Sequence, residues 1–281
     1  MIGVVLLGAG CPHEKNDVKD PPPGGGSGSA AATTGFAVAP PRVDQGEQFS
    51  YVLALQGVEL ATYDFTVAGT EMVGDKQAIV VKSHAKAIGF VKMVANVDDF
   101  FTSWIDAQTG RPLHWVSDEF ATKSTDRERT DVHFDQRQGD QVPVDFHLND
   151  DPAKPEPQKV TFPEVWDYNS LMVAFRGWEA PVGSTVTGEV FRSRFMWHYT
   201  IKIHGKETLT TKLGDFPALR IDGHVFKVDR AGTAIAADDE RDFSIWVSDD
   251  GGRVPLLIVA KTDYGDIKMS ISAYDPGQAG R

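Results

Sequence analysis

The sequence predicts an all-β fold: an antiparallel meander that forms a curved sheet or a partly open barrel, with one short helix. Three observations lead to this prediction. Apolar and polar residues alternate with period two in run after run from about Gly46 onward, as they do in strands with one buried and one solvated face. Turn-forming residues separate the last of these runs. A single segment changes to three- and four-residue spacing, which is typical of a helix.

The alternating runs define the expected strands. In the longest, FRSRFMWHYTIKIH, the odd positions from Phe191 to Ile203 are apolar except for Ser193. The others share this pattern and centre on residues 49–55, 63–67, 79–83, 243–247, 254–258 and 267–271. Asp- and Gly-containing turns at 249–252 and 263–266 separate the last three runs, which predicts consecutive hairpins. The loop DDPAKPEPQK at 150–159 is expected to join two halves of one sheet system.

The segment EVWDYNSLMVAFRGW at 164–178 predicts the helix, with Asp167 as its cap and Gly177 as its end. Its apolar residues recur at helical spacing, so one face is expected to be buried. Two interpretations of that face remain open. It is a plug packed against the sheet, or it is a lid over a ligand. In the second case the candidate ligand-facing residues are Leu171, Met172 and Phe175.

The first residues of the chain indicate export. Ile2–Gly10 are all apolar or glycine, and this run is far shorter than the roughly 20 residues of a membrane-spanning helix. LGAGC at 7–11 resembles the lipobox of bacterial lipoproteins, so residues 1–10 are predicted to be a lipoprotein-type signal segment. The resemblance implies that Cys11, the only cysteine, is lipidated and anchors the protein to a membrane. The alternative is a free thiol on a disordered tail.

Composition sets the expected domain boundaries. Residues 11–45 contain PPPGGG and SGS and almost no large apolar side chains, so they are predicted to be a disordered tether behind the lipidated cysteine. Residues 46–275 are predicted to form a single β-rich domain, and residues 276–281 a disordered tail. Without a second cysteine, the stability of the domain is expected to come from its core rather than from a disulfide.

The net charge of the chain argues against two classes of binding partner. The net charge is −12, which argues against nucleic acid and against a basic patch for anionic membrane surfaces. TDRERTD at 125–131 alternates in charge, which predicts a solvated edge strand.

The sequence contains no motif for catalysis or metal binding. G-x-S-x-G, glycine-rich phosphate loops and H-E-x-x-H are absent. His198 and His204 share a predicted strand face, but about 20 Å of strand separates them, too far for one zinc ion. The acidic pairs at 98–99, 150–151 and 238–239 lack the spacing of a calcium loop. We therefore expect no catalytic residue, no metal, no cofactor and no enzymatic activity.

The end of the chain carries a family resemblance. FSIWVSDDGGRVPLLIVAKTDYGDIKMSI at 243–271 resembles the closing signature of the bacterial envelope family called domain of unknown function 3108. The matching residues are Ser248, Asp249, Asp250, Arg253, Pro255 and Gly265. Looser agreements extend the resemblance over most of residues 46–272. It implies an exported all-β domain in a Gram-negative envelope, and it implies no activity.

The motif also has a structural interpretation. The two aspartates accept hydrogen bonds in a turn, and Gly251 and Gly252 are expected to supply positive φ angles. Arg253 is expected to pair with an aspartate across the hairpin.

Two functional hypotheses follow. The first is a cell-envelope lipoprotein with a non-enzymatic binding or assembly role, and the second is a periplasmic carrier of an apolar ligand such as a lipid. In both, the protein faces the periplasm of a Gram-negative bacterium and is anchored through lipidated Cys11, in the outer membrane rather than the inner. The expected partner is an envelope protein, a glycan or a lipid.

Overall fold

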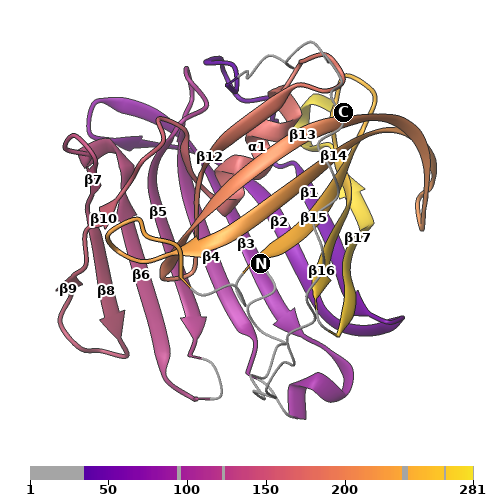
Figure 1. Cartoon of the computed structure of the whole chain (residues 1–281). Coiled ribbons are helices and arrows are strands. Elements are labelled where there is room, and N and C mark those ends of the chain that lie inside the picture. The colour runs from indigo at the N-terminus through magenta and orange to yellow at the C-terminus, as the bar shows by residue number, and fades with distance from the viewer. Residues whose placement is uncertain (1–34, 94–95, 122–123, 236–239, 263, 281) are drawn as a thin grey trace, which may run out of the picture.

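A computed structural model describes residues 35–93, 96–121, 124–235, 240–262 and 264–280 (Figure 1). Within this part of the chain, a 15-stranded sheet curves around one α-helix, α1 (Tyr168–Gly177). The predicted all-β class with one short helix is confirmed. Cys11, the predicted signal segment and the predicted tether up to residue 34 lie outside the described residues.

The strands follow the alternation that the sequence contains. Those of the large sheet are β1 (Gln48–Leu55), β2 (Val58–Val73), β3 (Lys76–Ala87), β4 (Asp98–Asp106), β5 (Pro112–Phe120), β6 (Arg127–His133), β8 (Val144–Leu148), β9 (Lys154–Pro155), β11 (Val165–Asp167), β12 (Thr185–Arg192), β13 (Phe195–Thr211), β14 (Gly214–Val228), β15 (Arg241–Ser248), β16 (Pro255–Thr262) and β17 (Gly265–Asp275). A second, two-stranded sheet pairs β7 (Gln141–Val142) with β10 (Gln158–Lys159). Short 3₁₀ helices are η1 (Gly89–Met93), η2 (Phe134–Gln136) and η4 (Gly277–Gly280).

Two meanders make up the large sheet. Its order is β11-β12-β13-β14-β15-β16-β17-β1-β2-β3-β4-β5-β6-β8-β9, so β11 and β9 are its edges and the sheet is open. The meanders meet where β1 pairs with β17, with Tyr51 opposite Ile271. The loop at 150–159 connects the two meanders along the chain, as predicted. In space, the two meanders are joined by the pairing of β1 with β17. All neighbours are antiparallel except β11 and β12, which run parallel.

The sheet curls until its halves face each other. Trp115 of β5 and Val132 of β6 share an apolar cluster with Phe191 of β12 and Met196 of β13. A larger cluster fills the space between α1 and strands of both halves. The inner face is therefore a packed core, and the other face is solvated.

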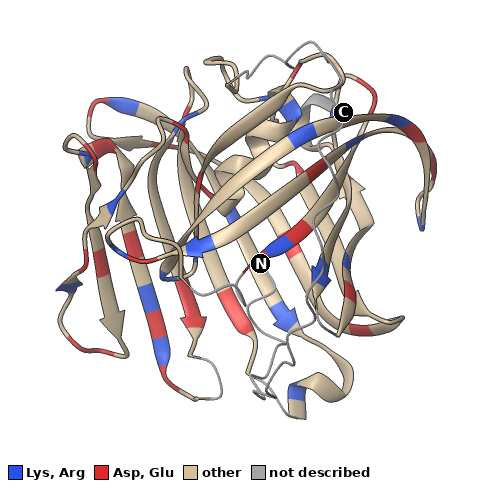
Figure 2. Cartoon of the chain, in the orientation of Figure 1, with Lys and Arg blue, Asp and Glu red and all other residues tan. Residues whose placement is uncertain are grey.

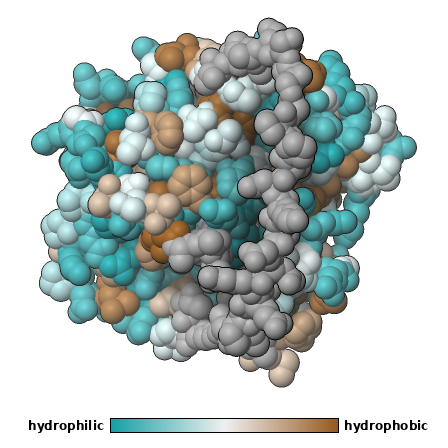
Figure 3. All heavy atoms as spheres, viewed as in Figure 1, coloured by the Kyte–Doolittle hydropathy of each residue, from teal (hydrophilic) through white to brown (hydrophobic). Residues whose placement is uncertain are grey.

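The strand β6 lies between β5 and β8, so the prediction of an edge strand at 125–131 is wrong. Alternating charge marks a strand with a solvated face, and it does not reveal whether a further strand pairs beside it. Figure 2 shows basic and acidic residues following one another along β6. On the face in Figure 3, most of the visible surface is hydrophilic and apolar residues form small separate patches.

The domain extends beyond both predicted boundaries. Residues 35–45, assigned to the disordered tether, lie against the domain, and Phe36 is buried in the main core. The predicted disordered tail at 276–281 includes η4, and the Gln278 amide donates to the Gln45 carbonyl. A Cβ on Gly277 would lie 2.5 Å from the Glu47 amide nitrogen, so only glycine fits this contact. One buried aromatic residue holds this mostly exposed segment against the domain, although no other large aromatic side chain lies near it in the sequence.

No helix in the described ranges is long and apolar enough to cross a membrane.

Candidate functional site

The first turn of α1 is fixed by a buried capping box. Asp167 accepts a hydrogen bond from the Ser170 amide at 3.0 Å, and the Ser170 hydroxyl contacts the Asp167 amide at 3.1 Å. Ser103 of β4 donates to the same carboxylate at 2.6 Å. Burial raises the pKa of Asp167, and the hydrogen bonds from Ser103 and Ser170 offset part of this rise. The predicted cap is confirmed; the residues just before it, Val165–Asp167, form β11 instead of helix.

A second polar contact ties this turn to the sheet. The Tyr63 hydroxyl donates to the Ser83 hydroxyl at 2.7 Å, and Ser83 donates to the Asn169 side-chain oxygen at 2.8 Å. All three residues are buried. Because an unpaired buried polar group is costly, these bonds specify one position for α1 inside the curved sheet.

The other end of α1 is held by Arg176. Its guanidinium contacts both carboxylate oxygens of Glu47, at 2.6 and 2.9 Å, and donates to the Gly252 carbonyl at 2.9 Å. The Tyr274 hydroxyl donates to Glu47 at 2.8 Å. The helix, the start of the domain and the C-terminal motif therefore meet at one guanidinium.

The motif itself forms a tight turn between β15 and β16. One carboxylate oxygen of Asp250 accepts from the Ser248 hydroxyl and from the amides of Gly252 and Arg253, at 2.7–3.1 Å. Arg253 lies 3.9 Å from Asp249, the pairing that the sequence predicts. The positive φ belongs to Arg253, at 47°, and not to Gly251 or Gly252, so that expectation is wrong. Asp250 accepts hydrogen bonds from the amides of Gly252 and of Arg253, so the turn closes at Arg253, and this residue takes the positive φ.

The remaining motif residues also make structural contacts. The Pro255 carbonyl accepts from the buried Tyr51 hydroxyl at 2.9 Å, which links β16 to β1. Gly265 has a φ of 112° at the turn between β16 and β17. These contacts support a structural role for the motif.

The three candidate ligand-facing residues lie in the core. Leu171, Met172 and Phe175 are buried and belong to the main apolar cluster. The opposite side of α1, formed by Val173, Ala174 and Gly177, lines a half-open pocket of about 370 Å³. Leu171, Met172 and Phe175 do not line this pocket, because the curved sheet wraps the face of the helix that carries most of its large apolar side chains.

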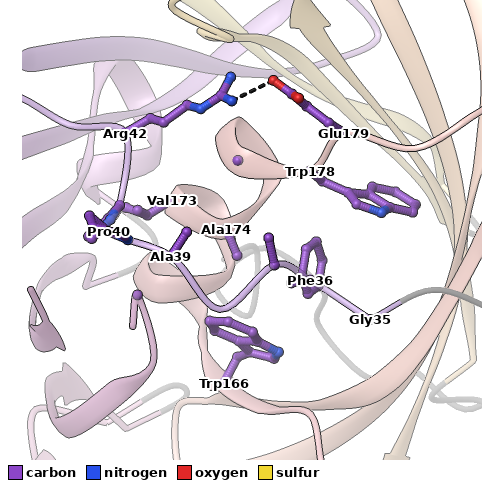
Figure 4. Close-up of a pocket in the computed structure, with 14 residues that line it drawn as sticks. Gly35, Phe36, Ala39, Pro40, Arg42, Trp166, Val173, Ala174, Trp178 and Glu179 are labelled. Atoms are coloured by element: carbon purple, nitrogen blue, oxygen red, sulfur yellow. Dashed lines mark hydrogen bonds and ion pairs between the residues drawn. The ribbon is translucent and has the colours of Figure 1, made fainter. Parts of the chain in front are cut away.

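The pocket lies between α1 and the chain segment that enters the domain (Figure 4). Its lining residues are Gly35, Phe36, Ala37, Ala39, Pro40, Pro41, Arg42, Gly110, Trp166, Val173, Ala174, Gly177, Trp178 and Glu179. An ion pair between Arg42 and Glu179 crosses its rim. The other lining side chains are apolar, although polar atoms also form part of the accessible lining. The indole N–H groups of Trp166 and Trp178 are both buried without a hydrogen-bond partner among the described residues.

Phe36 is the anchor of the entering segment. Its ring makes edge-to-face contacts with Trp166, Phe175 and Trp178, with centroids 5.4–5.8 Å apart. Arg111 donates to the Phe36 carbonyl at 3.3 Å and stacks over the Trp166 ring at 4.7 Å. Sequence reasoning missed Phe36, although it is the only aromatic residue before Phe49.

The arrangement can accommodate an apolar group between α1 and the entering segment. Arg42 and Glu179 are the charged residues of the lining, and they are paired with each other. We find no nucleophile placed beside a base in it.

Comparisons with known proteins agree with this fold. A family model described as a protein of unknown function (DUF3108) matches residues 50–272. A β-barrel-like protein of the domain of unknown function DUF1849 from Brucella abortus has a similar fold, with a TM-score of 0.52 and 11% identity over 83% of this chain and 99% of that one. No curated protein matches the chain.

Two further solved structures match more distantly. They are a candidate exported protein with a YmcC-like fold from Bacteroides fragilis and a candidate lipoprotein from Parabacteroides distasonis. Both have a TM-score of 0.38, with 5% and 6% identity over 85% and 84% of this chain and 99% of each of those chains.

Proposed function

The chain belongs to the DUF3108 family of proteins of unknown function, and from this premise we propose that it is a non-enzymatic binding lipoprotein of the cell envelope. One observation carries the proposal. Phe36, which follows the tether, is buried beside a half-open pocket that lies against α1 and is lined mostly by apolar side chains. The segment that leads to the anchor thus forms one wall of the binding site.

Anchoring is the first part of the proposal. Cys11 would carry the lipid, and residues 12–34 would link it to the segment that holds Phe36. The lipobox-like sequence supports a periplasm-facing protein in a Gram-negative envelope, with the outer membrane favoured over the inner.

Binding of a partner at the pocket is the second part. A volume of about 370 Å³ lies at the small end of the range for ligand sites, roughly 300–1,000 Å³. Such a pocket suits one apolar or aromatic group that projects from a larger envelope partner. The ion pair at the rim, Arg42 with Glu179, would fix the orientation of that partner through polar contacts.

A carrier of an apolar ligand is the second candidate, favoured by the apolar lining. It ranks below the binding role because Leu171, Met172 and Phe175 are packed in the core. A carrier needs an enclosed volume for the whole ligand, and this packing leaves the helix little space to cover one.

The test compares two tryptophan variants of the full chain, purified from membranes in mild detergent. Ala174→Trp fills the pocket, whereas Val182→Trp adds the same side chain at an exposed site. We expect a fluorescent apolar probe to bind the wild type and the Val182 variant at one site, and to lose that site in the Ala174 variant. Equal binding by all three proteins would overturn the pocket assignment.

Mass spectrometry of organic extracts from the same preparation separates the two candidates. The binding role predicts no stoichiometric lipid other than acyl groups attached to Cys11. One equivalent of a free lipid, lost in the Ala174 variant, would favour the carrier.

A further inference from the structure

The solvated face of β5, β6 and β8 brings together two imidazoles and two carboxylates. His114 of β5 lies directly opposite His133 of β6, and Asp131 precedes His133 by two residues on the same face. Asp145 of β8 lies opposite Asp131. From this geometry we propose that His114, Asp131 and His133 bind one divalent cation of the Zn²⁺ class.

The donor atoms are already gathered. One donor atom from each of the three side chains lies within 4.8 Å of the others. His133 Nε2 is 3.4 Å from Asp131 Oδ1, and His114 Nε2 is hydrogen-bonded to the same oxygen. With metal–ligand distances of about 2.0–2.2 Å, the donor atoms of a tetrahedral site lie about 3.3 Å apart. The His133–Asp131 pair already has this separation, the hydrogen-bonded His114–Asp131 pair must open to admit the ion, and the two imidazole donors lie within 4.8 Å of each other.

The imidazole rings need only a local adjustment. They stack with centroids 4.8 Å apart and planes inclined by 7°, so their nitrogen lone pairs run side by side. Rotation of each ring about its terminal torsion directs both lone pairs to one point, and that torsion is soft. Trp104 stacks on the other side of His114 at 4.6 Å, which limits the movement to His133 and a small turn of His114.

The backbone beneath the cluster is rigid. Trp115 and Val132, the neighbours of His114, Asp131 and His133 along their strands, are fully buried on the inner face. Alternation along a strand therefore fixes the outward direction of the three candidate ligands. A preformed site of this kind does not depend on folding around the metal.

Charge and exposure suit a cation. The side chains of His114, Asp131 and His133 are 21, 16 and 24% exposed, so an ion can enter and water can occupy a remaining position. An aspartate carboxyl ordinarily has a pKa near 4. The carboxylate is therefore ionised at neutral pH and available as a ligand.

The residues around the three candidate ligands affect the affinity and selectivity of the site for metal ions. Arg129 contacts the other carboxylate oxygen of Asp131 at 3.3 Å, which orients the carboxylate and leaves Oδ1 for the metal. Its positive charge also weakens cation binding. Asp145 Oδ2, 3.8 Å from His133 Nε2, offers a fourth ligand and compensating charge. Two nitrogen donors and one oxygen donor favour Zn²⁺ and related ions over Mg²⁺ and Ca²⁺, which prefer oxygen ligands.

The chain provides a matched control. His84 pairs with Asp98 at 2.6 Å and stacks on Phe100 with ring centroids 4.3 Å apart. This pair has the same chemistry on the neighbouring strands β3 and β4, but it does not belong to the three-residue cluster.

The test is a Zn²⁺ titration of the full chain, without a histidine tag, against a chromophoric chelator at neutral pH. We expect one equivalent to bind to the wild type and to the His84→Ala variant. His133→Ala and the isosteric Asp131→Asn each remove a direct ligand, so each should weaken binding by at least the roughly 10–100-fold that loss of an outer-shell partner costs. Thermal unfolding without metal shows whether each variant is folded. Added Zn²⁺ should raise the melting temperature of the wild type and not that of the His133 variant.

Co²⁺ provides a second readout that does not depend on stability. A bound Co²⁺ with nitrogen and oxygen ligands should show visible absorption in the wild type and lose it in a folded His114→Ala variant. Binding of Zn²⁺ that is unchanged in folded variants at His114, Asp131 and His133, or less than one equivalent in the wild type, would overturn the proposal.

Discussion

Arg176 and Glu47, 129 residues apart in the sequence, form a bidentate ion pair whose side chains are 6% and 1% exposed. It joins the end of α1 to the residue before β1. Because Arg176 also holds the Gly252 carbonyl, the pair connects the helix to the C-terminal motif turn.

Removing one partner of this pair should destabilise the protein strongly. Glu47→Gln or Arg176→Met leaves the other charge buried without its partner, and each should cost about 3–5 kcal/mol of unfolding free energy. Chemical denaturation measures this cost. Arg42→Ala, which breaks an exposed ion pair with Glu179, is the control and should leave stability unchanged. Equal stability of Arg176→Met and Arg42→Ala would contradict the importance of the buried pair.

Acidification should strengthen the fold through Asp99. Burial raises the pKa of Asp99 to about 6, with a further contribution from the charge of Glu119. The folded state then holds a proton that the unfolded chain releases near pH 4, so this contribution is full below about pH 4 and is lost as pH rises through 6. A shift of about two pKa units corresponds to roughly 3 kcal/mol.

Asp99→Asn isolates this effect. The variant should lose the decrease in unfolding free energy between about pH 4 and 6 that the wild type shows. Denaturation curves at several pH values measure the difference. Parallel pH profiles for the two proteins would show that Asp99 titrates normally.

Two substitutions in α1 distinguish a packed core from a ligand lid. Phe175→Ala should cost about 3–5 kcal/mol and Met172→Ala about 2–5 kcal/mol, because both side chains are buried in the main cluster. Probe binding by the Met172 variant should persist as long as it is folded, since Met172 does not line the pocket. Intact stability together with lost binding would instead support the carrier.

Anchoring should depend on Cys11. In the native host, Cys11→Ser should move the protein from the membrane fraction to the soluble fraction, because a serine cannot accept the lipid. Fractionation and the mass of the N-terminal peptide check this expectation. Membrane retention of the variant, with no acyl mass on the wild type, would contradict it.

The sequence predicted more of the fold than of the site. The alternating runs appear in the structure, as do the cap at Asp167 and a helix within the predicted segment, Tyr168–Gly177. The sequence left two interpretations of the apolar helix face open, a plug and a ligand lid, and the structure agrees with the plug because Leu171, Met172 and Phe175 lie in the main core. The pocket instead involves Phe36, in a segment whose composition predicts disorder.

By itself, the sequence determined what depends on neighbours along the chain: strand alternation, the helix cap, and the hydrogen-bonded turn at 248–253. Only the tertiary structure decided which strands lie side by side. Pairing of β5 with β6 brings His114 to His133, and pairing of β1 with β17 closes the domain beside Glu47 and Arg176. The expectation that no metal binds followed from histidine spacing along the chain. Distances across a sheet are set by strand pairing and register, about 5 Å between opposed residues whatever their sequence separation. The register of β5 against β6 depends on the turn that joins them as well as on the alternation within each strand, so histidine spacing along the chain does not reveal it.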